Sequence, residues 1–172
     1  MRFVDLLKST VLLSLVSASL LAVVTVVTAN LADDPQLVLL ATGWWVLSGA
    51  TGAWMGRRLE PTEAVAAALR DAKTTSTLPE MRQGRMLLNR LWPLIVATVM
   101  ASAAAVFWPQ VAGIGAGFCV IWSLSWRHQE AAVTAIEERD GVTFFVASTS
   151  AFGAVKLVRT PGLRREVPQG AI

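Results

Sequence analysis

The most informative absence in this sequence is that of charge inside its long apolar stretches. Residues 9–56 and 91–126 contain only two charged side chains, Asp33 and Asp34. An ionisable side chain inside a membrane span usually marks a proton relay, a coupled substrate site or a gating charge. Small four-helix, proton-coupled drug exporters carry a carboxylate within the membrane, and these stretches have no equivalent. The absence argues against a secondary transporter that acts alone.

Cysteine and histidine are also scarce. Cys119 is the single cysteine and lies inside an apolar stretch, so it cannot support a disulfide framework and is expected to pack as a small apolar residue. His128 is the only histidine, with no cysteine or second histidine to join it as a metal ligand. We therefore expect neither a metal nor a cofactor.

Catalytic motifs are missing as well. The sequence has no nucleophile-elbow serine motif, no phosphate-binding loop and no paired carboxylates at a meaningful spacing; Glu137, Glu138 and Asp140 are interpreted as solvated charges at a helix end. The two polar parts, residues 57–90 and 127–172, are short for a soluble catalytic domain. We expect a protein that is not an enzyme. An enzyme would need catalytic groups among residues 82–90, His128 and Glu130.

The basic residues are strongly patterned. All fifteen Lys and Arg fall at residues 2–8, 57–90 and 127–165. Short loops rich in Lys and Arg remain cytoplasmic, which places these blocks inside and Asp33–Asp34 outside. This rule, with contact to anionic headgroups, explains the net charge of +3 and the pI near 9.8 without a nucleic-acid partner.

At about 20 residues per crossing, the apolar stretches predict transmembrane helices at 9–30, 37–56, 91–108 and 111–126, with both termini cytoplasmic. Residues 1–56 would form one transmembrane hairpin. Residues 91–126 would form a second, tight one because Pro109 ends the third helix. The last helix would cover only about 24 Å of a roughly 30 Å core. Alternatively, residues 1–29 are a cleaved signal peptide, although their apolar run exceeds the usual roughly 7 to 15 residues.

The polar parts carry weaker patterns. Within the basic loop 57–90, PTEAVAAALRDAK predicts a short amphipathic helix that lies on the headgroups or against the C-terminal part. Within 127–172, a helical extension is expected to stop at Asp140-Gly141, followed by a β-hairpin over 142–159 and a disordered end at 163–172. The expected fold is an all-α membrane protein with four transmembrane helices, a small cytoplasmic helix and a C-terminal β-hairpin.

Small residues follow a helix-packing spacing. Packing rather than hydrophobic exclusion drives helix association in lipid. The glycines at this spacing are Gly49, Gly52 and Gly56 in the second stretch and Gly113 and Gly117 in the fourth. These faces would pack within one chain, or they would join copies of the chain or hold a partner's helix. In the second case Gly52→Leu should abolish association.

Two further groups are candidate binding residues. Trp44 and Trp45 lie deep in the second stretch, where each indole N–H needs an acceptor; interhelical packing is one explanation and an apolar ligand, such as a lipid or quinone, is the other. A ring of arginines is expected at the inner face, either to set topology or to contact anionic lipid. Its members are Arg57, Arg58, Arg82, Arg85, Arg90 and Arg127.

Three segments, LPEMRQGRMLLNRLWPL, RHQEAAVTAIEERDGVTFFV and LVRTPGLRRE, resemble small multi-pass membrane proteins of uncharacterised function from actinobacteria. The resemblance covers residues 78–166. It implies a bacterial plasma (inner) membrane and brings no activity with it. Twelve Arg against three Lys, with abundant Ala, Val and Gly, indicate the same setting.

Together these patterns predict a non-enzymatic accessory or assembly subunit that makes protein and lipid contacts. The alternative is a small oligomeric transporter, channel or lipid-handling component with Trp44 and Trp45 along its path. Only the alternative predicts that Trp44→Ala changes a flux or a ligand affinity while assembly survives.

Overall fold

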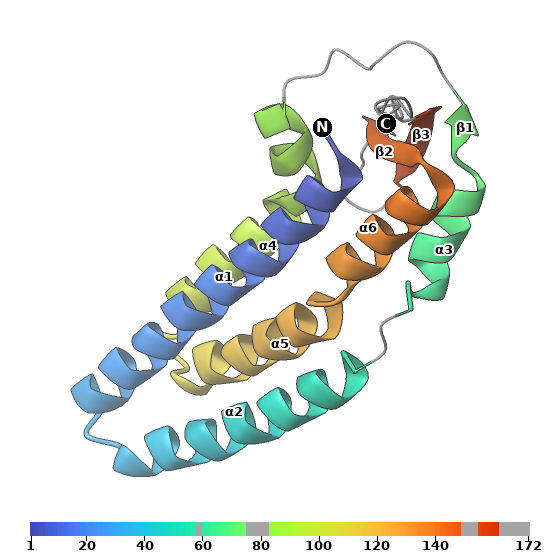
Figure 1. The fold of residues 1–172 in the computed structure, drawn as a ribbon. Coiled ribbons are helices and arrows are strands. Elements are labelled where there is room, and N and C mark those ends of the chain that lie inside the picture. The colour runs from blue at the N-terminus through green and yellow to red at the C-terminus, as the bar shows by residue number, and fades with distance from the viewer. Residues whose placement is uncertain (58–59, 75–82, 149–154, 162–172) are drawn as a thin grey trace, which may run out of the picture.

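The computed structural model describes residues 1–57, 60–74, 83–148 and 155–161. In these residues the chain is mostly helical and carries one small sheet (Figure 1). The elements are α1 (Phe3–Leu31), α2 (Pro35–Met55), α3 (Glu63–Arg70), β1 (Lys73–Thr74), α4 (Gln83–Ala104), α5 (Gln110–Trp126), α6 (Gln129–Asp140), β2 (Val142–Ser148) and β3 (Lys156–Pro161). The disordered end expected at residues 163–172 and the loop between the two strands lie outside the described residues.

The long helices begin and end where local chemistry directs. At the start of α2, Asp34 accepts a hydrogen bond from the Leu37 N–H at 3.2 Å, and Pro35 occupies the first turn, where its missing N–H costs nothing. The third long helix, α4, was predicted to extend to residue 108, but it is shorter. It ends at Ala104, and the following residues form a turn in which the N–H groups of Phe107 and Trp108 both donate to the Ala104 carbonyl.

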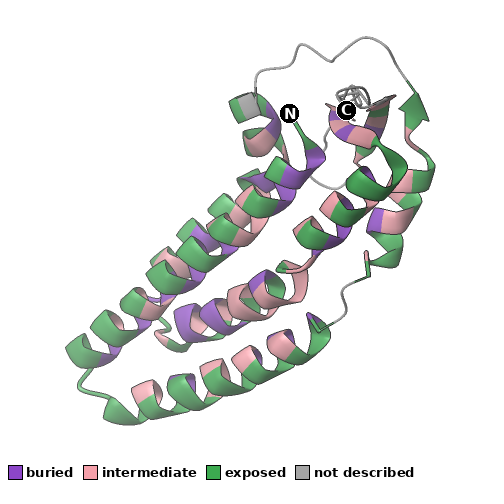
Figure 2. Ribbon diagram, in the orientation of Figure 1, coloured by how far each residue is buried: buried purple, intermediate pink, exposed green. Residues whose placement is uncertain are grey.

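α5 occupies the centre of the helical part, between α1 and α2 (Figure 1). Its buried positions are all small, namely Ala112, Gly113, Ala116, Gly117 and Ser123, so two helices can approach it from different sides. It packs more extensively against α1 and α2 than against α4, its neighbour in sequence. Of the tight hairpin predicted for residues 91–126, α5 thus makes its main contacts outside the hairpin, with α1 and α2. Figure 2 shows the resulting burial along α5.

The C-terminal hairpin is present but belongs to a larger sheet. β2 and β3 are antiparallel, with Phe145 opposite Val158, and β1 lies parallel to β3 on its other side. The N-terminus adds to the edge of β2, where Arg2 bridges Phe145 and the Val146 N–H donates to the Met1 carbonyl at 3.0 Å. The residues that precede α1 are thus tied to β2.

At this end of the helices, distant segments share an apolar core. Phe3 of α1, Val65 of α3, Val133 of α6 and Val146 of β2 are all buried in it. We call the first turns of α1 and α4, together with α3, α6 and the sheet, the cap. Of the two surfaces considered for the short helix, α3 lies against the C-terminal part. α6 is separated from α5 at residues 127–128, and it ends at Gly141, whose φ of 62° favours glycine.

Candidate functional site

Gly52 of α2 and Gly56, which follows its last residue, face α5 of the same chain. A Cβ added at Gly52 would lie 2.9 Å from the Ile121 Cα, and one added at Gly56 would collide with the Leu124 carbonyl oxygen. Gly49, three residues before Gly52, has no atom within 4 Å of the same position. The glycine spacing in this helix therefore consists of two contact positions and one open position.

The glycines of α5 serve both of its neighbours. A Cβ at Gly113 would lie 3.3 Å from Thr25 Cγ2 of α1 and 3.4 Å from Ala41 Cβ of α2. At Gly117 a Cβ would collide with the Trp44 indole of α2. Gly115 was not singled out from the sequence, yet a Cβ there would lie 3.2 Å from Leu21 Cδ1 of α1. Except at Gly49, these glycines contact a neighbouring helix of the same chain, so their faces are already occupied within one chain.

Both deep indoles find their acceptors on α5. The Trp44 Nε1–H donates to the Ile114 carbonyl at 3.2 Å, and the Trp45 Nε1–H donates to the Gly113 carbonyl at 2.9 Å. The Trp44 ring also meets Phe118 edge-on, with centroids 5.6 Å apart. Interhelical hydrogen bonds in membranes average about 0.6 kcal/mol. The two tryptophans thus tie α2 to α5.

The hydroxyl groups between the helices are mostly satisfied locally. Thr25 donates to the Leu21 carbonyl and Thr98 to the Leu94 carbonyl, both at 2.8 Å. Ser48 is the exception, because its buried Oγ has no hydrogen-bond partner among the described residues. It lies beside Gly117, where an added Cβ would be only 2.6 Å from the Ser48 Oγ. The contact between α2 and α5 is accordingly tight and leaves no evident polar path.

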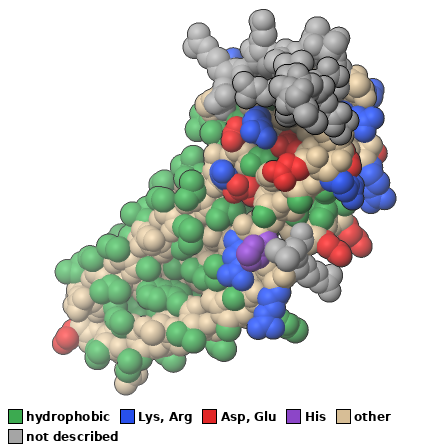
Figure 3. Space-filling view, in the orientation of Figure 1, with side chains coloured by type: hydrophobic (Ala, Val, Ile, Leu, Met, Phe, Trp, Pro, Cys, Tyr) green, Lys and Arg blue, Asp and Glu red, His purple; other side chains and the backbone are tan. Residues whose placement is uncertain are grey.

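The described arginines of the predicted ring do not line a common cavity. Arg58 and Arg82 lie outside the described residues, and Arg57 and Arg85 are exposed at the ends of α2 and α4. Arg127 lines a small cavity of about 310 Å³, whereas Arg90 lines a different, larger one. Figure 3 shows that charged side chains nevertheless collect at the cap, while the surface along the helices is mainly hydrophobic.

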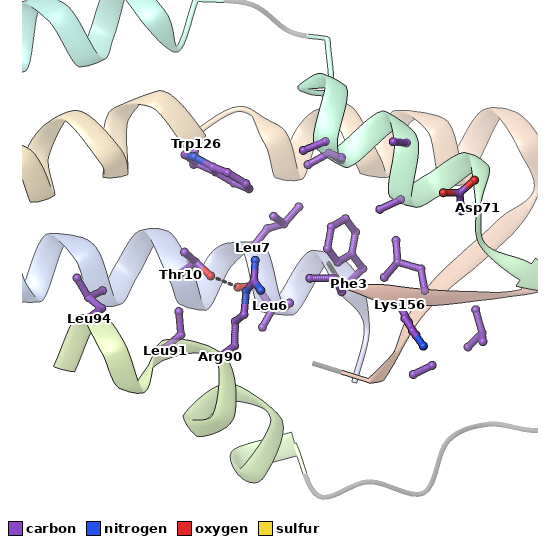
Figure 4. A pocket seen from close by; sticks show the side chains of 18 of the residues that line it. Phe3, Leu6, Leu7, Thr10, Asp71, Arg90, Leu91, Leu94, Trp126 and Lys156 are labelled. Atoms are coloured by element: carbon purple, nitrogen blue, oxygen red, sulfur yellow. Dashed lines mark hydrogen bonds between the residues drawn. The ribbon is translucent and has the colours of Figure 1, made fainter. Parts of the chain in front are cut away.

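The larger cavity, which we call the boundary cavity, has a volume of about 1120 Å³ and lies where the helices meet the cap. Leu7, Leu94 and Trp126 contribute from the long helices (Figure 4), while α3 and β3 complete the wall. Its lining is mostly apolar, with four charged residues, namely Asp71, Lys73, Arg90 and Lys156. Sequence reasoning singled out only Arg90, because the other contributors come from separate segments whose meeting leaves no local pattern.

Glu137 is not a solvated helix-end charge, contrary to the interpretation of the sequence. Its side chain is only 5% exposed, and it accepts hydrogen bonds from Arg2 and from the Phe144 N–H, both at 2.8 Å. It sits one helical turn after Val133, on the face of α6 that meets the cap core. The four-residue spacing between Val133 and Glu137 could have indicated from the sequence that Glu137 lies on the buried face of α6.

The remaining polar groups of the cap are paired or exposed. Lys8 and Glu130 form an ion pair at 2.9 Å. Asp140 is exposed, and a hydrogen bond from Arg139 lowers the pKa of its carboxyl. Among the described residues, no three His, Cys, Asp or Glu side chains are grouped as metal ligands would be. His128 stands at the start of α6, and this geometry assigns it no chemical role.

Among the residues that the structure describes, the fold is mostly helical with a small sheet, and three helices are long and apolar enough to cross a membrane, which is consistent with a membrane protein. These are Phe3–Leu31, Pro35–Met55 and Gly84–Ala104. Comparison with protein-family models, curated proteins and solved structures found no match to this chain.

Proposed function

We propose that this chain is a non-enzymatic integral membrane protein with four spans, which acts as an accessory or assembly subunit through protein and lipid contacts. The observation that carries the proposal is the contrast between a filled interior and a broadly apolar exterior. Small residues and bonded indoles fill the helix contacts. Large apolar side chains such as Leu39, Leu47 and Val99 are exposed instead, as lipid or a partner's helix would require.

The fourth span is α5. It has 17 residues, which extend about 26 Å at roughly 1.5 Å per residue, somewhat less than a typical hydrocarbon core. A short span is accommodated by local thinning of the bilayer or by snorkelling side chains. The position of α5 between two candidate spans, α1 and α2, supports a transmembrane placement, because a helix enclosed by spans shares their depth.

Both termini are assigned to the cytoplasm of a bacterium, and the membrane to its plasma (inner) membrane. Met1 and β2 lie side by side in the cap, where Lys and Arg are abundant, and the turn bearing Asp33 and Asp34 is at the opposite end of the helices (Figure 1). The positive-inside rule then sets the orientation. α1 packs along α5 and starts within the cap. Removal of residues 1–29 as a signal peptide would therefore expose the α1-facing side of α5 and part of the cap core. This consequence favours an uncleaved first span.

Cysteine labelling tests this topology. In a Cys119→Ala background, which has no other cysteine, we expect Asp33→Cys to react with a membrane-impermeant maleimide on intact cells. Glu63→Cys and Glu138→Cys should react only after permeabilisation, because residues on both sides of α4 and α5 share one compartment. Labelling of Glu138→Cys but not Glu63→Cys on intact cells would show that α5 does not cross.

The subunit role is tested by purification. A C-terminally tagged chain, extracted from native membranes in a mild detergent, should have a particle mass well above that of the 18.4 kDa chain with its detergent and lipid, and should carry a stoichiometric membrane-protein partner. A homo-oligomer with no other protein would contradict the accessory role and favour the alternative, a small oligomeric transporter, channel or lipid-handling component.

One observation favours the lipid-handling part of that alternative. The boundary cavity is large, mostly apolar and rimmed by basic residues. A path along Trp44 and Trp45 has less support, because both indoles are bonded to α5 and a path there would have to break the contact between α2 and α5.

A further inference from the structure

We propose that the boundary cavity binds one anionic phospholipid from the adjoining leaflet. The phosphate would lie near the basic side chains of the lining, and the acyl chains would lie along the lining residues that belong to the spans. This inference deepens the lipid contacts of the proposed function and rests on the membrane placement given there.

The position of the cavity matches the two parts of such a molecule. One wall comes from residues within the apolar stretches, including Thr10, Leu94 and Trp122. The other comes from the cap, through Val65 of α3 and Leu157 of β3. The cavity therefore spans the level at which hydrocarbon gives way to headgroups, where Trp and basic residues gather in membrane proteins. A ligand that occupies it must be apolar at one end and polar at the other.

The size of the cavity suits a lipid better than a small metabolite. Ligand pockets usually measure roughly 300 to 1,000 Å³, and this cavity reaches about 1120 Å³. Trp122 lines it while remaining 53% exposed, and its ring stacks on Trp126 at a centroid distance of 5.6 Å. An exposed, span-level aromatic side chain on the lining indicates that the cavity is continuous with the lipid-facing surface.

The charge of the lining selects an anion. Lys73, Arg90 and Lys156 stand against one acidic residue, Asp71. Figure 4 shows Arg90 rising from α4 toward α1, where it lies beside Leu6, and Lys156 at the cap side. An arginine matches phosphate oxygens with paired N–H donors, and lysine adds a point charge. Basic residues at the cytoplasmic surface also attract anionic lipid in general, so selectivity must be shown to depend on this cavity.

A soluble protein segment fits these features less well than a lipid. It would have to pass the headgroup level to reach Leu94 and Trp122, and its backbone N–H and C=O groups would then need partners in a mostly apolar wall. A phospholipid meets the same wall with chains that carry no hydrogen-bonding groups.

The experiment uses the full chain in vesicles of phosphatidylglycerol and phosphatidylcholine in equal amounts, extracted in mild detergent and examined by native mass spectrometry. The expected result is one phosphatidylglycerol retained per chain in preference to phosphatidylcholine. Ala67→Trp should reduce this retention several-fold, because Ala67 lines the cavity, is exposed, and would extend a large side chain into it. Ala66→Trp is the matched control, since Ala66 is on the same helix but does not line the cavity.

A charge variant provides a second, independent test. Lys156 is exposed on the lining, so Lys156→Glu should lower retention of phosphatidylglycerol and leave phosphatidylcholine unchanged. Arg139→Glu, which changes an exposed arginine away from the cavity, should have no effect. Equal retention of the two lipids by the unmodified chain, or undiminished retention by Ala67→Trp and Lys156→Glu, would overturn the inference.

A different experiment tests the proposed function itself, namely extraction of the membranes with alkaline carbonate. If alkaline carbonate releases the chain from membranes, the integral placement is wrong and the cavity proposal falls with it. If the chain resists carbonate and keeps a stoichiometric partner but shows no lipid preference, only the cavity proposal is lost.

Discussion

Gly52→Ala should destabilise the protein by about 1–3 kcal/mol, the usual cost of overpacking a close contact, whereas Gly49→Ala should be neutral or slightly stabilising. At Gly52 the added methyl group would meet the Ile121 Cα at 2.9 Å, and backbone cannot move aside as a flexible side chain can. At Gly49 the same methyl group meets nothing within 4 Å, and Ala is the better helix former. The two variants differ only in which side of α2 receives the methyl group.

The measurement is the free energy of unfolding in detergent. It is obtained by titrating both variants and the unmodified chain with a denaturing detergent. Gly52→Leu should show a larger loss, with separation of α2 from α5 in a single chain. Equal stability of the Gly49→Ala and Gly52→Ala proteins would contradict the packing described for α5. If Gly52→Leu dissociated an oligomer yet left the monomer's stability unchanged, the glycine face would be an intermolecular contact instead.

The helical part was largely predictable because length, hydropathy and charge act locally. Residues 37–56 were expected as a helix and α2 occupies Pro35–Met55; the apolar run and the Asp34-Pro35 start specify it. The requirement that Trp44 and Trp45 find acceptors was also evident. Their acceptors were not, because a backbone carbonyl of α5 has no signature in the sequence, and the central position of α5 depends on contacts between helices that are distant along the chain.

The cap was less predictable for a related reason. Alternation of apolar residues indicated the hairpin, and β2 and β3 form it. The third strand, β1, is only two residues long, too short to carry any pattern, and the bridge from Arg2 reaches Phe145, which is distant along the chain. The boundary cavity inherits this difficulty, since it exists only where those segments meet. Local patterns thus specified the elements, while the candidate site arose from how they assemble.

The largest effect in the cap is expected for Glu137→Ala, with a loss of about 1–3 kcal/mol, the cost of leaving a buried donor without an acceptor. The Phe144 N–H, in a residue only 3% exposed, donates to the Glu137 carboxylate at 2.8 Å. Arg2 would lose its partner too, but its side chain is 51% exposed, so water compensates much of that loss. The backbone hydrogen bond, rather than the ion pair, should therefore dominate.

This ranking separates three variants. Glu137→Gln retains a carbonyl oxygen for the Phe144 N–H and should be much milder than Glu137→Ala, while Arg2→Ala should fall between them or near Glu137→Gln. Glu130→Ala, which breaks the more exposed pair with Lys8, is the control and should be nearly neutral. Amide hydrogen exchange at Phe144 and Val146 provides the local measurement, because Val146 donates to the Met1 carbonyl and should lose protection when the N-terminus detaches. Unchanged protection at both amides in Glu137→Ala would show that the N-terminus is held to β2 by the apolar contacts of Met1 and Phe3 instead of by this carboxylate.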